Sequence, residues 1–457
     1  MNEQQILLSY YGDDFTGSAD VLEALSLNGI PTILFIEPPK SNDIANFTWK
    51  IKPNEKSKWL AFGVAGIARS LDPEAMEAEL DPIFHKLSRI PSRFFHYKIC
   101  STLDSSPKTG NIGKAMEIAE KYFPSSFIPM LMGLPLLNRF VVFGHLFAKI
   151  GTKTYRLDRH PVMSKHPVTP MDESDIRLHL HKQMDKNMAL VDYFDLENVL
   201  EFTPQRLSGD FTYRENPPLI LFDTLEHNHL KLIGEWLNAY GRKQHQLLLG
   251  SSAIEYALGE VFGRKAEEVK DHGPTSSMLI VSGSCSQTTA DQITYVQNLG
   301  YVGIRLKIEQ LHDRVSLETE KKRVIQLAVN HLMDGKHVVI YSALGPNDPS
   351  VRNTMEAGNN SLEPHFIAKT QAKITLAILN QTEIKRLVTA GGDTSGYILK
   401  ELEIQALEFI QVLAPGAPMC VAHSRSKAID GLEIAIKGGQ NGTVQYFEWA
   451  QKGEVRE

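Results

Sequence analysis

The chain has 457 residues, of which 42% are hydrophobic and 22% are charged, and its 48 basic against 54 acidic residues give a formal net charge of −6. This balance excludes a strongly basic nucleic-acid-binding surface over the whole chain, and no apolar run reaches the roughly 20 residues that a bilayer span needs. Three widely separated cysteines and the lack of a secretory signal predict a cytoplasmic protein without a disulfide framework.

Short apolar runs alternate with helical patterns from the first residues onward. The run at 6–11 predicts a buried strand, the apolar residues from Ala19 to Leu27 predict a helix, and the run at 32–36 predicts a second strand. This strand–helix–strand unit predicts a parallel sheet with helices on both faces. Further strands are expected at 59–62, 94–99, 219–222 and 246–249.

The segment 263–274 is charged, lacks apolar periodicity and ends in Gly-Pro, so it predicts a linker. After it the alternation restarts, with helices expected at 290–299 and 317–333 and strands at 278–281, 303–306, 338–341, 386–390 and 409–413. We therefore expect an α/β protein made of two three-layer domains with mostly parallel sheets. They would span 1–265 and 275–457, with the active site in the cleft between them.

Ligands of open α/β sheets collect at the carboxyl ends of the strands, so the loops after strands are the expected sites. The first such loop carries Asp13 and Asp14 between glycines. Two adjacent carboxylates can bind sugar hydroxyls, hold a cation or accept a proton from an attacking hydroxyl. The alternative is that one aspartate caps the following helix and both favour its positive end.

A second loop begins where Lys98 ends a strand and continues through Ser101, Thr102 and Asp104. A lysine with hydroxyls suits a carboxylate or polyol ligand, and the helix start that follows adds backbone donors. By composition alone, an ordinary hydroxyl-rich loop is the better explanation.

A third segment carries Arg156, Arg159 and His160, which suit recognition of an anion, with a surface ion-pair network as the alternative. The histidines of this region show no spacing typical of a metal site, so we reject zinc. His179 and His181 are two apart on a predicted helix and should point to different faces.

Glycine-rich loops recur in the second half of the chain. Gly391, Gly392, Asp393 and Thr394 enter a helix, where glycines let the backbone approach a phosphate and free N–H groups can bind it. Similar loops lie at 282–286, 415–418 and 437–442 and include Ser284 and Gly439. One such loop is usually a turn, but several in one domain favour a phosphate site. The chain has neither a P-loop nor a dinucleotide fingerprint, so a nucleotide would be held by a less common arrangement.

In chain order, these motifs resemble the four-carbon acid sugar kinase family, formerly a family of unknown function, which includes 3-oxo-tetronate, threonate and erythronate kinases. The resemblance rests on 13–17, 100–105, 110–113, 144–147, 166–171, 282–286, 391–396 and 415–418. It implies an N-terminal domain for an acid sugar, a C-terminal domain for ATP, and phosphorylation of the terminal hydroxyl of a tetronate or oxo-tetronate. Cys100 stands where many members have Asp, and Asp104-Ser105 stand where they have Arg-Gly, a pattern closer to the oxo-tetronate branch.

The resemblance leads to a hypothesis for the first domain. Asp13 and Asp14 would bind the hydroxyls of the sugar acid, and Lys98 and Arg159 would face its carboxylate. The remaining residues of the expected substrate site are Ser101, Thr102, Asp104 and His160.

In the second domain, ATP with Mg²⁺ on its phosphates would lie on Ser284, Gly391, Gly392, Asp393, Thr394 and Gly439. Asp393 is favoured as the base that accepts the hydroxyl proton, and Asp14 is the rival. The ligands of the metal and the oligomeric state, a homodimer among the options, are left open.

Three alternatives to a tetronate kinase exist. A non-catalytic sugar-acid-binding protein would leave the glycine loops of the second domain unexplained, and a kinase for a different small hydroxy acid stays open. A lyase or aldolase would need a Schiff-base lysine or a dedicated metal cage, and the spacing provides neither.

Overall fold

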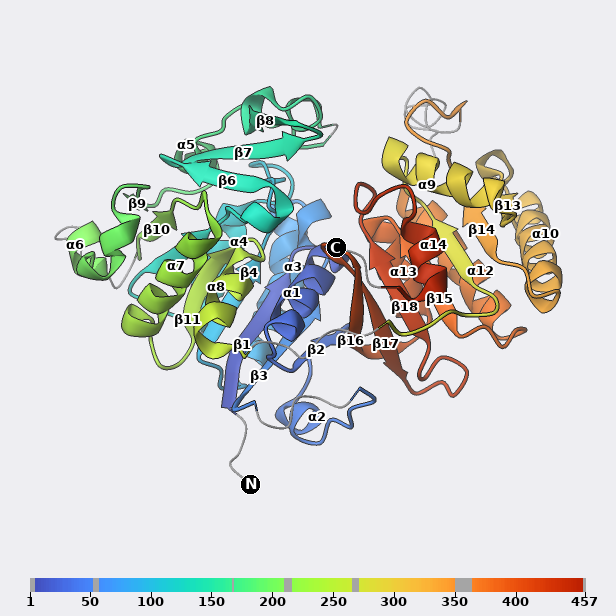
Figure 1. The fold of residues 1–457 in the computed structure, drawn as a ribbon, viewed down its shortest axis with the longest axis horizontal. Coiled ribbons are helices and arrows are strands. Elements are labelled where there is room, and N and C mark those ends of the chain that lie inside the picture. The colour runs from blue at the N-terminus through green and yellow to red at the C-terminus, as the bar shows by residue number, and fades with distance from the viewer. Residues whose placement is uncertain are drawn as a thin grey trace. The chain divides into compact units, whose positions relative to one another are not determined.

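The computed structural model describes residues 5–51, 57–166, 168–208, 216–264, 271–349 and 364–454. The chain divides into two compact units, Met1–Thr48 with Pro53–Glu267 and Trp49–Lys52 with Glu268–Glu457. Each unit is taken by itself, and both are drawn in Figure 1. Of the expected linker at 263–274, residues 265–270 lie outside the described ranges.

The first unit is built on a sheet of parallel strands in the order β2–β3–β1–β4–β11–β5–β10–β9. The strands are β1 (Gln5–Gly12), β2 (Thr32–Phe35), β3 (Trp59–Ala65), β4 (Phe94–Lys98), β5 (Ile128–Leu131), β9 (Met188–Val191), β10 (Leu219–Phe222) and β11 (Gln246–Gly250). The central strands are buried nearly throughout, which is why each reads as a continuous apolar run rather than as an alternation.

Helices cover both faces of this sheet. They are α1 (Phe15–Leu27), α3 (Pro73–Leu87), α4 (Ile112–Tyr122), α7 (His227–Tyr240) and α8 (Ala253–Phe262), with the shorter α2 (Ser41–Ala45), α5 (Ile176–His181) and α6 (Pro204–Ser208). In Figure 1, α1, α7 and α8 lie on one face, and α3 and α4 pair on the other.

A small antiparallel sheet lies beyond the carboxyl edge of the parallel strands (Figure 1). Its strands are β6 (Arg139–Val142), β7 (His145–Ile150) and β8 (Lys153–Arg156). Val141 bridges Thr224, just after β10. The buried Asp223 carboxylate accepts the backbone N–H groups of Phe143 at 2.6 Å and Gly144 at 2.9 Å. These bonds fasten the small sheet at the end of the parallel sheet where ligands are expected.

The second unit has a sheet in the order β13–β14–β12–β15–β18–β17–β16. Its strands are β12 (Leu279–Ser282), β13 (Val302–Arg305), β14 (Val338–Tyr341), β15 (Arg386–Ala390), β16 (Ile404–Ala414), β17 (Ala417–Ser424) and β18 (Glu433–Lys437). The strands from β13 to β18 in this order are parallel, whereas β17 is antiparallel to both β18 and β16.

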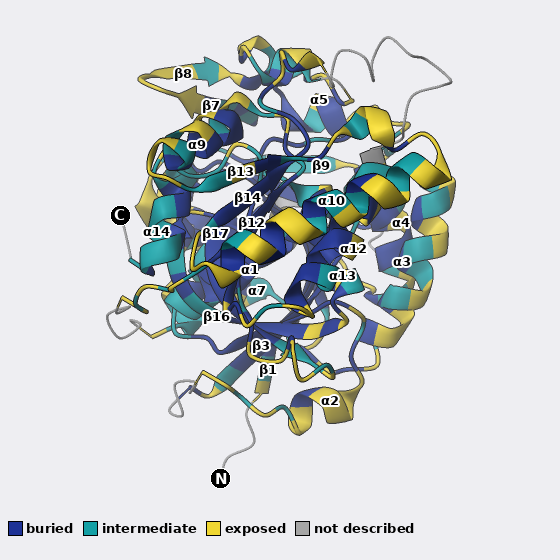
Figure 2. Ribbon diagram, turned by 90° about the vertical axis from the view of Figure 1, so that its right-hand side faces the viewer, coloured by how far each residue is buried: buried dark blue, intermediate teal, exposed yellow. Residues whose placement is uncertain are grey.

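The helices of the second unit are α9 (Gln287–Asn298), α10 (Arg314–Met333), α12 (Pro364–Leu379), α13 (Gly392–Glu401) and α14 (Tyr446–Lys452). Helices α9 and α14 pack together on one face, and α10, α12 and α13 form the other layer. Figure 2 shows α10 with an exposed outer side, while β12 and β14 are buried. No helix in the described part of the chain has both the length and the apolar character to cross a membrane.

A short excursion of the N-terminal half belongs to the second unit. The backbone N–H groups of Lys50 and Ile51 donate to the carboxylate of Glu408 on β16 at 2.8 and 2.9 Å. The Lys50 ammonium also lies 2.7 Å from Asp430. Sequence analysis did not anticipate this excursion, because nothing in the local pattern marks it.

The predicted fold class is confirmed, since both units are α/β with mostly parallel strands. Each strand that an apolar run predicted is present. One expectation is corrected: the loop at 415–418 is the tight turn between the antiparallel strands β16 and β17, with Gly416 at φ +69°. Its glycine serves the reversal of the chain rather than a strand-to-helix phosphate loop.

Candidate active site

In both units the strand order reverses beside the first strand. Strand β1 lies between β3 and β4, and β12 lies between β14 and β15. Such a reversal opens a crevice outside the carboxyl ends of the strands, where α/β proteins bind their ligands. The loops at 13–14 and 283–286 leave the sheets at these two points.

Asp13 and Asp14 share one arginine. Arg69 donates to both carboxylate oxygens of Asp13, from Nε at 3.2 Å and from Nη2 at 2.6 Å, and Nη2 also reaches Asp14 Oδ1 at 2.8 Å. Arg69 lies in the 3₁₀ turn Ala68–Ser70, shortly after β3, which pairs with β1. Sequence analysis missed Arg69, although an arginine just beyond the end of the neighbouring strand is a signal that could have found it.

The two aspartates differ in their electrostatics. Burial raises the pKa of Asp13 more than the Arg69 guanidinium lowers it. Burial acts the same way on Asp14, but Arg69, the Thr16 hydroxyl and the Gly17 amide together hold the pKa of Asp14 below its usual value. Asp14 is also the N-cap of α1. Asp14 therefore caps the helix, as the alternative explanation proposed, and it also bonds to Arg69. Asp13 bonds to Arg69 through both of its carboxylate oxygens.

Lys98 ends β4 directly opposite Gly12 and is 2% exposed. Its Nζ lies 3.5 Å from Asp20 Oδ2. Burial alone would lower the pKa of Lys98, but Asp20, Asp13 and Asp14 outweigh it and raise the pKa. A Cβ on Gly17 would lie 2.5 Å from Asp14 Oδ1 and 3.1 Å from Lys98 Nζ, so a glycine is needed where these charges gather.

The loop after β4 lies beside this cluster. Cys100 Sγ lies 3.0 Å from Thr102 Oγ1, which donates to Asp104 Oδ1 at 2.7 Å. Burial, with the nearby Asp104, raises the pKa of Cys100 to about 11 against the opposing field of Arg69, so the thiol is protonated at neutral pH. Ser101 is half-buried in the same turn.

The structure places Arg159 in a surface ion-pair network. Its side chain is 75% exposed, and its Nε lies 3.2 Å from Asp158 Oδ2. Arg156 already holds that carboxylate through two bonds of 2.7 Å. Asp13 and Asp14, with Arg69 and Lys98, form what we call the acid cluster. Among the described residues, no hydrogen bond or ion pair joins Arg159 to it.

His160 and His179 are both buried within the fold. His160 is buried, and its Nδ1 accepts the backbone N–H groups of Val162 at 3.3 Å and Met163 at 3.2 Å. His179 is buried on α5, whereas His181 is exposed, as the predicted spacing requires. Burial lowers the pKa of His179 to about 4.

In the second unit, three expected nucleotide loops meet. The Gly283 N–H donates to the carbonyl of the last residue of β15 at 3.1 Å, and the Gly391 N–H donates to Lys437 O at 3.0 Å. A Cβ on Gly439 would lie 2.7 Å from Ser284 Oγ, and one on Gly391 would lie 3.4 Å from Ser284 N. The loops after β12, β15 and β18 therefore pack closely against one another.

Helix α13 starts within this group with no side-chain cap. Its N-cap is Gly391 at φ +113°, which supplies no acceptor for the first-turn amides. By contrast, Ser286 Oγ caps α9 by accepting the Thr289 N–H at 3.1 Å. An uncapped helix start with adjacent glycines suits an anion. In its first turn Asp393 is exposed and Thr394 is buried.

Lys437 lies at the base of the same loops. It is fully buried, and its Nζ donates to Thr289 Oγ1 at 2.9 Å and to Gly439 O at 3.5 Å. Burial lowers the pKa of Lys437 to about 7. Sequence analysis named it only as the first residue of a glycine loop, although a lysine that ends an apolar strand before two glycines is a signal for an anion site.

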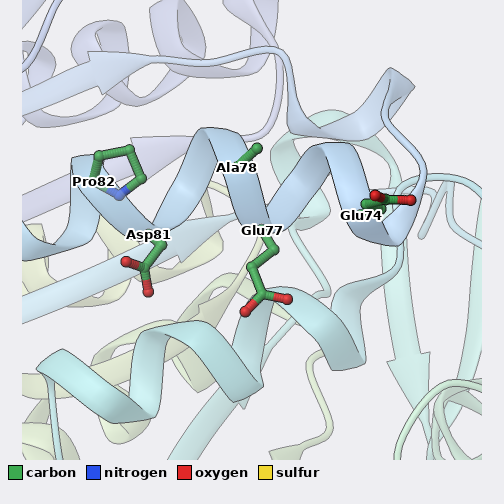
Figure 3. Close-up of a pocket in the computed structure, with 5 residues that line it drawn as sticks. All are labelled: Glu74, Glu77, Ala78, Asp81 and Pro82. Carbon is green, nitrogen blue, oxygen red and sulfur yellow. The ribbon is translucent and has the colours of Figure 1, made fainter.

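A groove on the first unit is unrelated to these clusters. Figure 3 shows it along α3, lined by Glu74, Glu77, Ala78, Asp81 and Pro82. Its acids are engaged by lysines of α4: Lys114 lies 2.7 Å from Glu77, and Lys121 lies 3.8 Å from Asp81. The groove is thus part of the charged surface where two helices pair.

Comparison with known proteins decides the family. Two family models match, a sugar-binding N-terminal domain at residues 8–258 and a nucleotide-binding C-terminal domain at residues 279–447. The chain belongs to the four-carbon acid sugar kinase family. The resemblance inferred from the motifs is therefore confirmed, and the acid cluster falls in the sugar-binding domain, whereas the glycine loops fall in the nucleotide-binding domain.

Curated relatives match this chain over nearly its whole length. A 3-oxo-isoapionate kinase of Paraburkholderia graminis is 35% identical, with 98% of this chain and 95% of the relative covered. A 3-oxo-tetronate kinase of Pectobacterium atrosepticum is 25% identical, with 98% and 99% covered. The predicted class of enzyme, a kinase, is confirmed by these relatives.

Solved structures show the same fold. A crystal structure of a Salmonella typhimurium LT2 protein matches with a TM-score of 0.75 at 22% identity and covers 97% of this chain and 98% of its own. A Haemophilus influenzae protein of family DUF1537 matches with a TM-score of 0.67 at 22% identity, covering 97% of this chain and 99% of its own.

Proposed function

We propose that the protein transfers the terminal phosphoryl group of ATP to the terminal hydroxyl of a small 3-oxo sugar acid. The whole-length similarity to kinases named for 3-oxo-isoapionate and 3-oxo-tetronate carries this proposal. Because the 3-oxo-isoapionate kinase is 35% identical and the 3-oxo-tetronate kinase 25%, 3-oxo-isoapionate is the first substrate to test.

The acid cluster of the sugar-binding domain suits a polyhydroxylated acid. A carboxylate has about four acceptor positions, so Asp13 can keep both bonds to Arg69 and still accept hydrogen bonds from sugar hydroxyls. Lys98 stays charged because its pKa is raised, and it adds positive charge beside the two aspartates. Arg69 and Lys98 together offset the repulsion between these acids and an anionic substrate.

The nucleotide-binding domain supplies donors for a triphosphate. The uncapped start of α13 offers backbone N–H groups, and the Ser284 and Thr394 hydroxyls lie in the adjoining loops. The lack of a side chain at Gly391 and Gly439 lets the backbone approach phosphate oxygens. These contacts support binding of ATP in this domain.

Magnesium suits this site as an ion carried by the nucleotide. The described residues contain no cluster of three His, Cys, Asp or Glu ligands. Mg²⁺ in kinases is typically held largely by the phosphates of the nucleotide. The ion would neutralise charge on the phosphates, while this chain orients the nucleotide.

For the base, Asp393 remains our preference over Asp14. Asp14 already accepts hydrogen bonds from Arg69, Thr16 and Gly17, and its lowered pKa makes it a poor proton acceptor. Asp393 is exposed beside the proposed phosphate site, where it can receive the proton of an incoming hydroxyl.

The test is a coupled ADP-release assay with Mg²⁺-ATP over 3-oxo-isoapionate, 3-oxo-tetronate, the reduced tetronates and neutral tetroses. We expect turnover with one of the 3-oxo acids, and phosphorus NMR should show a primary phosphate ester. Flat traces across the panel would reject the proposal. Titration with a non-hydrolysable ATP analogue separates a kinase from a non-catalytic sugar-acid binder, which would show no nucleotide binding.

A further inference from the structure

Arg139, the first residue of β6, has no carboxylate partner among the residues that the structure describes. Its Nη1 donates to two backbone carbonyls of the preceding turn, Leu137 O at 3.1 Å and Asn138 O at 3.2 Å. Its Nε is buried and has no hydrogen-bond partner. The edge formed by Nε and Nη2 is the one that grips a carboxylate through two parallel bonds, and in Arg139 no described protein acceptor occupies it.

The surroundings of Arg139 connect it to the proposed substrate site. Arg139 bridges Leu134 just after β5, and β5, β11 and β4 are parallel neighbours, so β6 starts at the same edge of the sheet as the loop after β4. Burial lowers the pKa of Arg139, whereas the charges of Cys100 and Asp104 in that loop act to raise it. Arg69 acts on the same Cys100 thiol. Of these two arginines, Arg69 is engaged by Asp13 and Asp14, whereas Arg139 has no acidic partner among the described residues.

The charge of Arg139 also acts on His160. Burial lowers the pKa of His160, and the positive charge of Arg139 lowers it further. Because His160 accepts backbone N–H groups at Nδ1, its neutral tautomer carries the proton on Nε2 and can donate from there. Asp104 and His160, both expected in the substrate site, thus interact electrostatically with an arginine that sequence analysis did not single out.

The backbone fixes the position of Arg139. Arg139 pairs with Ala148 of β7, and its N–H donates to Leu134 O at 3.1 Å. Two residues along the same strand, Val141 bridges Thr224 beyond the carboxyl end of β10. The side chain is consequently presented from a fastened strand, as a preorganised binding group must be.

We propose that Arg139 binds the carboxylate of the sugar acid through Nε and Nη2. This inference rests on the proposed function, because it assigns a ligand to the same substrate site. It assigns binding of the substrate carboxylate to Arg139, which has no acidic partner among the described residues. Arg159 is not chosen, because its Nε lies 3.2 Å from Asp158. Asp104 and Thr102 would then face hydroxyl groups rather than the acid.

The first test compares Arg139→Gln and Arg139→Lys in steady-state assays with the best 3-oxo acid. A lost bidentate pair to a charged group should raise the KM for the acid about 100-fold in the glutamine variant, with kcat and the KM for ATP within about threefold of wild type. The lysine variant keeps the positive charge but not the two parallel N–H donors of the guanidinium, so its KM for the acid should lie between those of wild type and the glutamine variant. Arg206→Gln, an exposed arginine of α6 in the same unit, is the matched control and should match wild type.

The second test changes the ligand instead of the protein. Wild type should disfavour the carboxamide of the substrate by about 100-fold in KM relative to the acid, and Arg139→Gln should lose most of that preference. A residue that only supports the fold would weaken both ligands alike. If the glutamine variant does not fold, the lysine variant is assayed with the same acid–amide pair.

The outcomes separate this inference from the proposed function. An active wild type whose acid preference survives in Arg139→Gln, or disappears in Arg159→Gln, overturns the assignment of Arg139 and leaves the kinase intact. If no acid is turned over, isothermal titration with tetronate alone decides. Weaker binding in Arg139→Gln than in wild type supports the carboxylate site, whereas equal binding, or none to wild type, overturns it.

Discussion

Lys437 Nζ donates to Thr289 Oγ1 over 2.9 Å, and both residues are buried. Thr289 Oγ1 in turn donates to Gly439 O at 2.7 Å. The hydrogen-bond partners of this ammonium are thus a hydroxyl and a carbonyl, neither of which carries a charge. Burial accordingly lowers the pKa of Lys437 to about 7, and a triphosphate on the adjoining loops would supply negative charge that raises it again.

Nucleotide binding should therefore be accompanied by proton uptake at pH 7 to 8, because Lys437 gains a proton when the phosphates arrive. Isothermal titration with a non-hydrolysable ATP analogue, repeated in buffers of different ionisation enthalpy, measures this uptake. Lys437→Met should bind more weakly and take up no proton. Identical heats in all buffers for the wild type would contradict the assignment of this charge change to Lys437.

The same lysine predicts a pH dependence of stability. The pKa of Lys437 in the folded state is about 7, below the ordinary lysine value of 10.5. Between these values the unfolded state binds more protons, so the free energy of unfolding should rise with pH over this window. Urea unfolding from pH 7 to 10 should show the rise in wild type and a flatter profile in Lys437→Met. Equal slopes in the two proteins would mean that Lys437 is charged in the folded state.

Replacing Arg69 by glutamine should destabilise the first unit by about 3 to 5 kcal/mol at pH 7, because it leaves Asp13 and Asp14 without their shared positive charge. Without Arg69 the folded pKa of Asp14 should rise, and that of Asp13, already raised by burial, should rise further, so the loss should shrink as pH falls toward 4. Urea unfolding at both pH values measures this. Adding Asp13→Asn to Arg69→Gln should restore part of the stability, and a simple sum of two losses would argue against the pairing.

The parallel strands could be predicted because each central strand is buried on both faces and is therefore a continuous apolar run. The small sheet β6–β8 could not, because its strands are partly exposed; the burial of Lys153–Arg156 follows no alternating pattern. Strand β5 was missed because Pro129 interrupts its apolar run. Because Arg139 lies on β6, its position could not be predicted either.

The acid cluster could be predicted in part. Asp13 and Lys98 follow or end adjacent strands, and the carboxyl ends of parallel strands meet at one edge. Arg69 lies 56 residues from Asp13 in a segment without a motif, so its place shortly after β3, the neighbour of β1, is the signal that links the two. For Arg159 the sequence left anion binding and a surface ion-pair network as alternatives, and in the structure its Nε lies 3.2 Å from Asp158 Oδ2.

Gly391→Ala should weaken nucleotide binding by at least tenfold. The φ of +113° at Gly391 is costly for alanine, and relaxing it would move the start of α13 and the neighbouring Ser284 backbone. Gly300→Ala is the matched control, because Gly300 has φ +95° with nothing within 4 Å of an added Cβ. Both variants should lose about 1 kcal/mol of stability, but only Gly391→Ala should change the Kd for an ATP analogue. Equal Kd values would remove this loop from the nucleotide site.

Asp393→Asn and Asp14→Asn should separate the base from the substrate-binding acids. Loss of a general base should lower kcat about 100-fold or more in Asp393→Asn, with little change in the KM for the sugar acid. Asp14→Asn weakens the cap of α1 and the bond to Arg69, so it should lower stability by about 1 kcal/mol and raise the KM for the acid. Turnover that survives in Asp393→Asn but is abolished in a folded Asp14→Asn would reverse the two roles. The base would then lie in the sugar-binding domain, where the lowered pKa of Asp14 requires that the substrate first displace Arg69 or Thr16 from its carboxylate.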